Sequence, residues 1–123
     1  MIDDLEKYAY LNKIPIMQKD GIEFLCNFIK KNNIKNILEI GSAIGYSAIR
    51  MALVDKDIKI VTVEKDINRY NIAFNNIKSF NLDNQITILN EDALNSNFSA
   101  CFDLIFIDAA KSHNIDFFNK FSS

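Results

Sequence analysis

The chain has little of several residue types whose abundance would set it apart from ordinary globular domains. Its 123 residues include no tryptophan, one proline, one histidine and two cysteines. The charges nearly cancel, with 14 Lys and Arg against 16 Asp and Glu, so no basic surface dominates and a nucleic-acid partner is disfavoured. The cysteines, Cys26 and Cys101, lie far apart in apolar surroundings, which predicts buried thiols in a reducing cytosol.

The sequence also lacks a long apolar run and a cationic start. No stretch approaches the roughly 20 apolar residues of a membrane span. Asp3, Asp4 and Glu6 stand where a signal peptide would be basic. We found neither internal repeats nor low-complexity segments. These features predict a single cytoplasmic domain, because this length suffices for one modest core.

Helical and extended patterns alternate along the chain. Apolar residues at helical spacing predict helices at about 2–9, 19–31, 46–54, 66–77 and 114–121. Apolar or β-branched runs predict strands at 35–40, 58–63, 85–89 and 102–107, with a polar loop at 90–100. Strands that are apolar on both faces predict a parallel sheet covered on both sides, the doubly wound α/β fold. Residues 1–33 would supply N-terminal helices and residues 34–123 the βα units.

The most informative segment follows the first predicted strand. Gly41 and Gly45 bracket a turn that leads into a helix, the usual place for a nucleotide-type cofactor. Ser42 and Ala43 are small enough to let a ligand approach the backbone. The third glycine of a dinucleotide turn is missing, which disfavours NAD and leaves an NAD-dependent oxidoreductase as a remote alternative. The glycine spacing alone fits a plain tight turn equally well.

Acidic residues stand at the ends of the next three predicted strands. Glu64 ends the second strand and can accept both hydroxyls of a ribose. Asp92 follows the third strand, where Ala93 leaves room for an adenine ring, and Asp108 ends the fourth. Each acid alone could be a solvated residue. Because parallel strands meet at one edge of a sheet, the set predicts a single crevice.

Together these segments resemble the cation-dependent small-molecule O-methyltransferases, which include the catechol and caffeoyl-CoA enzymes. The resemblance runs from about Ile14 to the end of the chain. It rests on the segments Glu39-Ile40-Gly41-Ser42…Gly45-Tyr46-Ser47, Val63-Glu64, Asp92-Ala93 and Phe106-Ile107-Asp108-Ala109-Ala110-Lys111. It implies a Rossmann-like class I methyltransferase that binds S-adenosylmethionine. The expected reaction transfers a methyl group to a hydroxyl of a catechol-like small molecule.

The resemblance also implies roles for individual residues. Glu39 would hold the methionine amino group, Ser47 the methionine carboxylate, and Glu64 the ribose. The other implied cofactor contacts are Ile16, Gly41, Ser42, Asp92, Ala93, Asp108 and Ala110. Asp108 would also bind Mg²⁺ or another divalent cation. Lys111 would take the proton of the acceptor hydroxyl, and its alternative is a surface lysine of a loop.

The sequence departs from this family on its C-terminal side. The family completes its metal site with an Asp-Asn pair that has no counterpart here, since Asp116 and Asn119 fall in the last predicted helix. The chain therefore resembles the first half to two-thirds of a methyltransferase, a single incomplete domain. A tRNA hydroxyuridine methyltransferase and a non-catalytic module that binds a cofactor or a partner stay open as alternatives.

An incomplete sheet has a physical consequence. With only four strands in the order 3-2-1-4, the fourth strand would lie at the edge of the sheet. Residues 102–107 are apolar and contain neither Lys nor Pro, so they would make a poorly protected edge. We therefore expect this edge to pair with a second copy of the chain, or the protein to aggregate.

Overall fold

The computed structural model describes residues 2–12, 16, 19–92, 102–109 and 114–119, with the backbone alone at 108–109 and 114–119. The elements follow the order α1 (Ile2–Leu11), α2 (Lys19–Lys31), β1 (Asn36–Ile40), α3 (Tyr46–Ala52), β2 (Lys59–Val63), α4 (Ile67–Ser79), β3 (Ile86–Leu89), β4 (Leu104–Ala109) and β5 (Asn114–Asn119). The first four helices and the first four strands confirm the predicted alternation, with shifts of a few residues at the ends.

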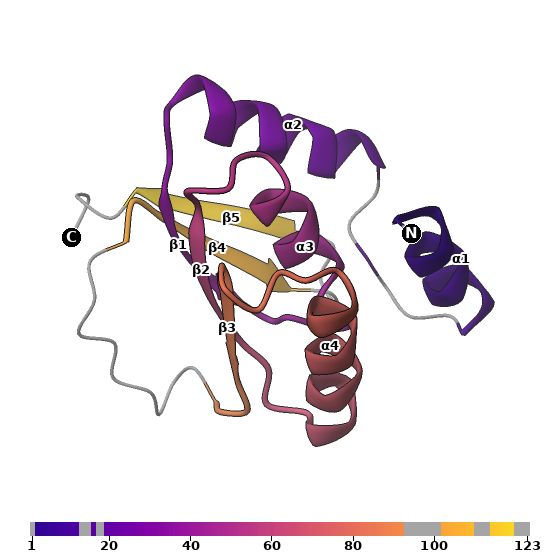
Figure 1. Ribbon diagram of the computed structural model, residues 1–123. Helices are drawn as coiled ribbons and strands as arrows, with labels where there is room; N and C mark the ends of the chain where they lie inside the picture. Colours follow the sequence, from indigo (N-terminus) through magenta and orange to yellow (C-terminus); the bar gives the residue numbers. More distant parts are fainter. Residues whose placement is uncertain (1, 13–15, 17–18, 93–101, 110–113, 120–123) are drawn as a thin grey trace.

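The strands form one sheet in the order β3-β2-β1-β4-β5 (Figure 1). Strands β1 to β4 run parallel, which confirms the expected order 3-2-1-4. Ile40 at the end of β1 pairs with Val63 of β2 and with Ile107 of β4. The carboxyl ends of β1 and β2 are therefore level, while β4 continues to Ala109, and the residues at these three ends share one edge of the sheet.

The prediction of a helix at 114–121 is wrong, because residues Asn114–Asn119 form strand β5. This strand runs antiparallel to β4, with Ile105 opposite Phe118 and Asp108 opposite Ile115. An exposed strand edge offers a row of unpaired backbone groups, and an antiparallel neighbour needs only a short connection to reach it. The same chain therefore occupies the β4 edge that we expected to pair with a second copy, and the sheet has five strands instead of four.

The described helices gather on one face of the sheet. Helix α2 buries Ile22, Leu25 and Ile29, whose spacing places them on one stripe, and α3 is buried along most of its length. These side chains pack against the face of the sheet that carries Ile37 and Phe106. On the other face, a smaller cluster is centred on Leu38, Val63 and Phe102. None of the helices that the structure describes packs on this second face.

Helix α4 corrects a second expectation. Asp66 caps its start, accepting hydrogen bonds from the backbone N–H of Asn68 at 2.9 Å and of Arg69 at 3.2 Å. The apolar stripe expected to face the core comprises Ile67, Tyr70, Phe74 and Ile77, and only part of it does so. Ile67 is 52% exposed and Phe74 is 41% exposed, whereas Ile77 is buried. The buried positions are Ala73 and Ile77. A small residue is needed at position 73 because the backbone of Gly45 packs against it.

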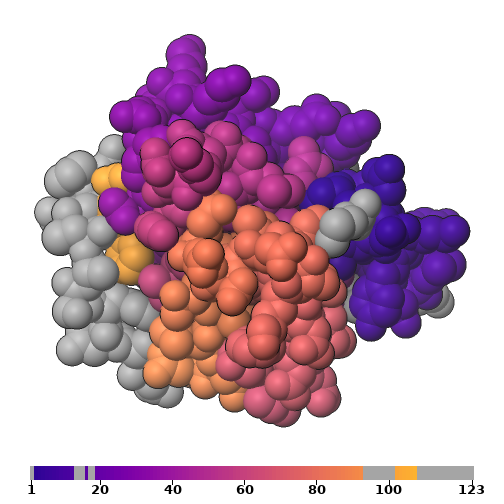
Figure 2. Space-filling view, in the orientation of Figure 1, coloured from indigo at the N-terminus to yellow at the C-terminus, as the bar shows by residue number. Residues whose placement is uncertain are grey.

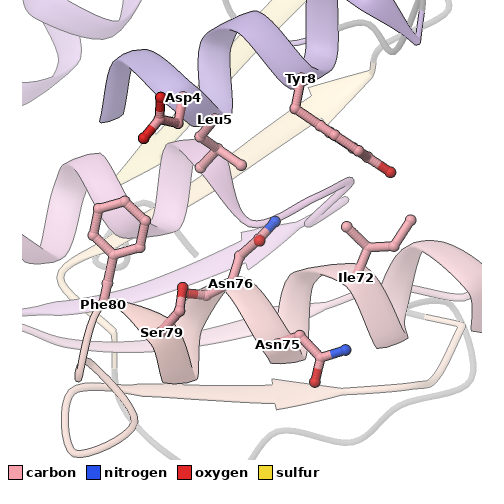
Figure 3. Close-up of a pocket in the computed structure, with 8 residues that line it drawn as sticks. All are labelled: Asp4, Leu5, Tyr8, Ile72, Asn75, Asn76, Ser79 and Phe80. Atoms are coloured by element: carbon pink, nitrogen blue, oxygen red, sulfur yellow. The ribbon is translucent and has the colours of Figure 1, made fainter. Parts of the chain in front are cut away.

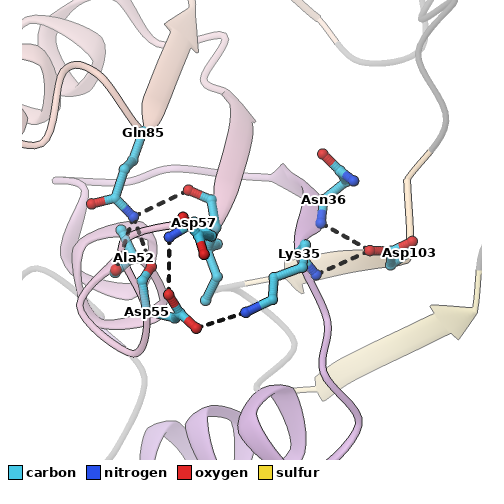
Figure 4. A network of polar contacts seen from close by, with 8 residues as sticks. Lys35, Asn36, Ala52, Asp55, Asp57, Gln85 and Asp103 are labelled. Carbon is cyan, nitrogen blue, oxygen red and sulfur yellow. Dashed lines mark hydrogen bonds and ion pairs between the residues drawn. The ribbon is translucent and has the colours of Figure 1, made fainter.

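A polar network closes the amino-terminal edge of the sheet, opposite the predicted crevice (Figure 4). The Lys35 ammonium lies 2.6 Å from an Asp55 carboxylate oxygen, and this contact lowers the pKa of Asp55. One carboxylate oxygen of Asp103 accepts from the backbone N–H of Lys35 and of Asn36, both at 3.0 Å. The Gln85 amide nitrogen donates to backbone carbonyls at 3.0–3.1 Å, those of residues 52, 55 and 58. These bonds join the loop after α3 to the starts of β2 and β3.

Two further expectations concern the thiols and the membrane. Cys26 is half-buried rather than buried; its thiol lies 3.6 Å from the Arg50 carbonyl oxygen, and burial raises its pKa. Cys101 lies outside the described residues.

None of the helices in the described part of the chain has the length and apolar character to cross a membrane.

Candidate functional site

The turn after β1 takes a shape that needs left-handed backbone at three positions. The φ angles are 96° at Gly41, 50° at Ala43 and 89° at Gly45. Hydrogen bonds stabilise the turn: the Gly41 N–H donates to the Val63 carbonyl at 2.8 Å, and the Gly45 N–H donates to the Ser42 carbonyl at 2.8 Å. The two glycines of the predicted cofactor turn thus lie at its points of tightest curvature, where a residue with a Cβ would be strained.

A chain of buried side-chain hydrogen bonds lies beneath this turn. Glu39 has no exposed area, and its two carboxylate oxygens accept from the hydroxyls of Thr62, at 2.6 Å, and of Ser47. Thr62 uses its single proton on Glu39. The contact of 2.5 Å between the Thr62 and Ser42 hydroxyls must therefore be a bond donated by Ser42. Glu39, Ser42, Ser47 and Thr62, here called the Glu39 network, tie β1, the turn, α3 and β2 into one unit.

Glu64 closes the turn from the end of β2. One of its carboxylate oxygens accepts from the Ala43 N–H at 2.7 Å, and the other accepts from the Asp66 N–H at 3.1 Å. The first bond holds Ala43 in its left-handed conformation. Glu64 is 7% exposed, and each oxygen keeps a lone pair that can accept from a ligand hydroxyl. The side chain of Asn90, after β3, donates to the Glu64 carbonyl at 2.9 Å, so β3 also contributes to this corner.

The remaining predicted site residues lie away from the hydrogen-bonded turn or are described only in part. Asp92 is exposed after β3, and Ile16 is half-buried against the main core. Asp108 follows Ile107 in β4, so its backbone lies at the same edge of the sheet as Gly41. Ala93, Ala110 and Lys111 lie outside the described residues. The structure therefore brings together Glu39, Gly41, Ser42, Ser47 and Glu64.

Sequence reasoning missed Thr62, which links Ser42 to Glu39. A signal was present: aligning the ends of the first two predicted strands places Thr62 directly opposite Glu39, and the structure has this register. A hydroxyl residue opposite a carboxylate in a parallel sheet indicates a buried polar pair rather than a solvated one.

The side chain of Asp108, the predicted cation ligand, lies outside the described residues, so cation binding stays a prediction. Mg²⁺ takes six oxygen ligands, usually including carboxylates. Among the side chains that the structure describes, no three His, Cys, Asp or Glu residues are grouped closely enough to hold a metal ion.

A cavity lies between α1 and α4, and one residue that lines it, Asn76, donates a hydrogen bond to the Ile44 carbonyl of the turn at 2.8 Å. Its volume is about 390 Å³. Leu5 and Tyr8 approach it from α1, and Ile72, Asn76 and Phe80 from the other side (Figure 3). None of the predicted cofactor residues lines it.

The strand order and the turn after β1 define a Rossmann-like methyltransferase fold, and comparison with known proteins agrees. A family model described as O-methyltransferase matches residues 1–122. The chain belongs to this family, which confirms the resemblance found in the sequence.

Individual relatives show how far the similarity extends. The chain is 35% identical over 91 residues to a catechol O-methyltransferase of Niastella koreensis, covering 68% of this chain and 41% of that protein. It is 29% identical over 115 residues to a caffeoyl-CoA O-methyltransferase of Populus kitakamiensis, covering 87% and 48%. The crystal structure of a Bacillus cereus O-methyltransferase in complex with SAH superposes with a TM-score of 0.74 at 28% identity, covering 88% and 53%. The chain thus spans about half the length of the relatives it matches.

Proposed function

We propose that this chain binds S-adenosylmethionine at the turn after β1 and forms the cofactor half of an O-methyltransferase. The observation that carries the proposal is the joint placement of the Glu39 network and Glu64 at one edge of the sheet. Two carboxylates at this edge suit a cofactor that carries an ammonium and a sulfonium group, because opposite charges attract strongly where water is excluded. The Bacillus cereus relative, whose structure is a complex with SAH, supports this class of cofactor.

Two parts of the cofactor, the ribose and the methionine end, have candidate partners in the described residues. The ribose hydroxyls would donate to the free lone pairs of Glu64. The methionine end would lie over Ser47, whose hydroxyl donates to Glu39 and leaves its oxygen able to accept from an ammonium group. Because Glu39 is fully buried, it would act on the cofactor through Ser47 rather than by direct contact. For Ser47 to bind the methionine carboxylate, as the resemblance implies, its hydroxyl would have to turn away from Glu39.

The acceptor that we propose is a small molecule with neighbouring ring hydroxyls. The names of the catechol and caffeoyl-CoA relatives support this class. In the proposed reaction a hydroxyl oxygen attacks the methyl carbon, the carbon–sulfur bond breaks, and the sulfonium becomes a neutral thioether. Lys111, deprotonated beforehand, would take the hydroxyl proton, and Asp108 would stand beside it at the end of β4. The pairing of Ile40 with Ile107 supports this proposal, because it places the backbone of Asp108 at the same edge of the sheet as Gly41.

Calorimetric titration with S-adenosylhomocysteine tests the cofactor site. We expect micromolar binding by the wild-type chain and binding about ten-fold weaker in Glu64→Gln, because the amide of Gln would confront the backbone N–H donors with a donor of its own. Asp83→Asn is the matched control, since Asp83 is exposed before β3 and outside the site. A folded wild-type sample that shows no binding at millimolar ligand would refute the proposal.

A further inference from the structure

Three side chains join α1 to the first turn of α3. Tyr46, the first residue of α3, is 2% exposed, and its hydroxyl donates to a Glu6 carboxylate oxygen at 2.5 Å. The same hydroxyl accepts from the Arg50 guanidinium at 3.1 Å. Arg50 also lies 3.7 Å from the Glu6 carboxylate and 5.9 Å from the centre of the Tyr46 ring. We call Glu6, Tyr46 and Arg50 the α1–α3 cluster.

Helix α1 has few other attachments. It lies at one margin of the molecule (Figure 2), where it buries Leu5 and Ala9. The cavity described above separates it from α4 (Figure 3). In the described part of the chain, Glu6 is the residue through which α1 forms hydrogen bonds to other elements. The α1–α3 cluster is therefore the main polar connection of this helix.

The α1–α3 cluster is linked covalently to the candidate site, because Tyr46 belongs to both. Tyr46 stands between Gly45, with its left-handed backbone, and Ser47, which donates to Glu39. The Ile49 N–H donates to the Gly45 carbonyl at 3.0 Å, so the turn and the start of α3 form one hydrogen-bonded unit. A shift of the Tyr46 ring would therefore move Ser47 and the turn with it.

We propose that Glu6, Tyr46 and Arg50 are positioning residues for the cofactor turn. Docking of α1 fixes the Tyr46 ring, which fixes the backbone of Gly45 and Ser47 and with it the Glu39 network. Because coupling between two sites is reciprocal, ligand binding at the turn must favour the docked state of α1 to the same degree. This inference depends on the proposed function for the identity of the ligand, while the mechanical link between α1 and the turn is independent of it.

The first arm of the test measures the free protein. Residue-resolved hydrogen exchange should show faster exchange of the Ile49 N–H than in the wild type, by about five-fold in Tyr46→Phe and by a smaller factor in Glu6→Gln, which keeps a neutral acceptor. Tyr10→Phe and Glu23→Gln are the matched controls, because Tyr10 is 83% exposed on α1 and Glu23 is exposed on α2. Glu6→Gln keeps the test open if Tyr46→Phe does not fold, since the Glu6 side chain is 35% exposed. Exchange at Ile49 that matches the controls would overturn the inference.

The second arm adds S-adenosylhomocysteine. We expect Tyr46→Phe, which removes the donor, to bind about five-fold more weakly, and Glu6→Gln, whose amide oxygen can still accept from Tyr46 but without a charge, to show a smaller loss of affinity. The double variant should lose no more affinity than Tyr46→Phe alone, because both substitutions act on the same hydrogen bond. Ligand should slow exchange in α1 of the wild type and leave it unchanged in Tyr46→Phe, an effect that a merely stabilising contact would not produce. If the affinity losses of the two single variants multiplied in the double variant, the proposed coupling between α1 and the turn would be overturned. If the folded wild type binds no ligand, the proposed function fails, and the exchange at Ile49 still decides the role of the cluster.

Discussion

Replacement of Thr62 by valine is the sharpest test of the Glu39 network. Valine has nearly the same shape as threonine and the same β-branching, so strand β2 and its packing should be retained. The change removes one hydroxyl that donates to Glu39 at 2.6 Å and accepts from Ser42 at 2.5 Å. Thr62 has no exposed area, so water cannot replace either bond.

The expected loss of stability follows from these two bonds. A hydrogen bond to a charged group contributes about 1.5–3 kcal/mol, and a buried hydroxyl left without its acceptor costs about 1–3 kcal/mol. Ser42 is 1% exposed, so its hydroxyl would be such a group. The free energy of unfolding should therefore fall by about 3 kcal/mol or more, a large part of the roughly 5–15 kcal/mol that a domain has.

Urea unfolding followed by circular dichroism measures this loss. For a slope of about 2 kcal/mol per molar urea, the midpoint should fall by about 1.5 M. Thr87→Val is the matched control, because Thr87 is an exposed threonine on β3 of the same sheet, and its effect should stay within about 0.5 kcal/mol. Thr62→Ser keeps the hydroxyl and should recover most of the stability. A Thr62→Val midpoint equal to that of the Thr87→Val control would refute the network.

Two further predictions concern residues beside the turn. Burial, with the Glu6 hydrogen bond as a second cause, raises the pKa of Tyr46 to about 12. The stability that this shift contributes is present below pH 10, the ordinary pKa, and is lost as the pH rises toward 12. In that window the wild type should lose stability more steeply than Tyr46→Phe, and equal slopes would count against the buried hydroxyl. Gly45→Ala should cost about 1–2 kcal/mol in the same urea assay, because the backbone is left-handed there (φ 89°) and the new Cβ would lie 3.4 Å from Ala73. An unchanged midpoint would show that the turn can relax.

Local pattern was enough to predict much of this fold. The β-branched and apolar runs at 35–40 and 58–63 indicate strands whatever surrounds them, because their side chains need burial on both faces. Asp66 caps α4 through bonds to residues two and three positions further along, so the sequence neighbourhood contains the whole interaction. The turn at Gly41 and Gly45 was likewise recognisable, since few other residues tolerate its backbone.

The sequence by itself therefore determined the alternation of elements, the strand order and the family to which the chain belongs. Only the tertiary structure decided that residues 114–119 extend as β5, because the deciding partner is the open edge of β4 and not a local helical spacing. It also decided that Ala73 rather than Phe74 faces inward, since Gly45 approaches α4 at that point. The burial of Glu39 under Ser47 and Thr62, and the contact of Glu6 with Tyr46, join segments far apart in the chain. Such contacts depend on register and packing between elements, which no short stretch of sequence records.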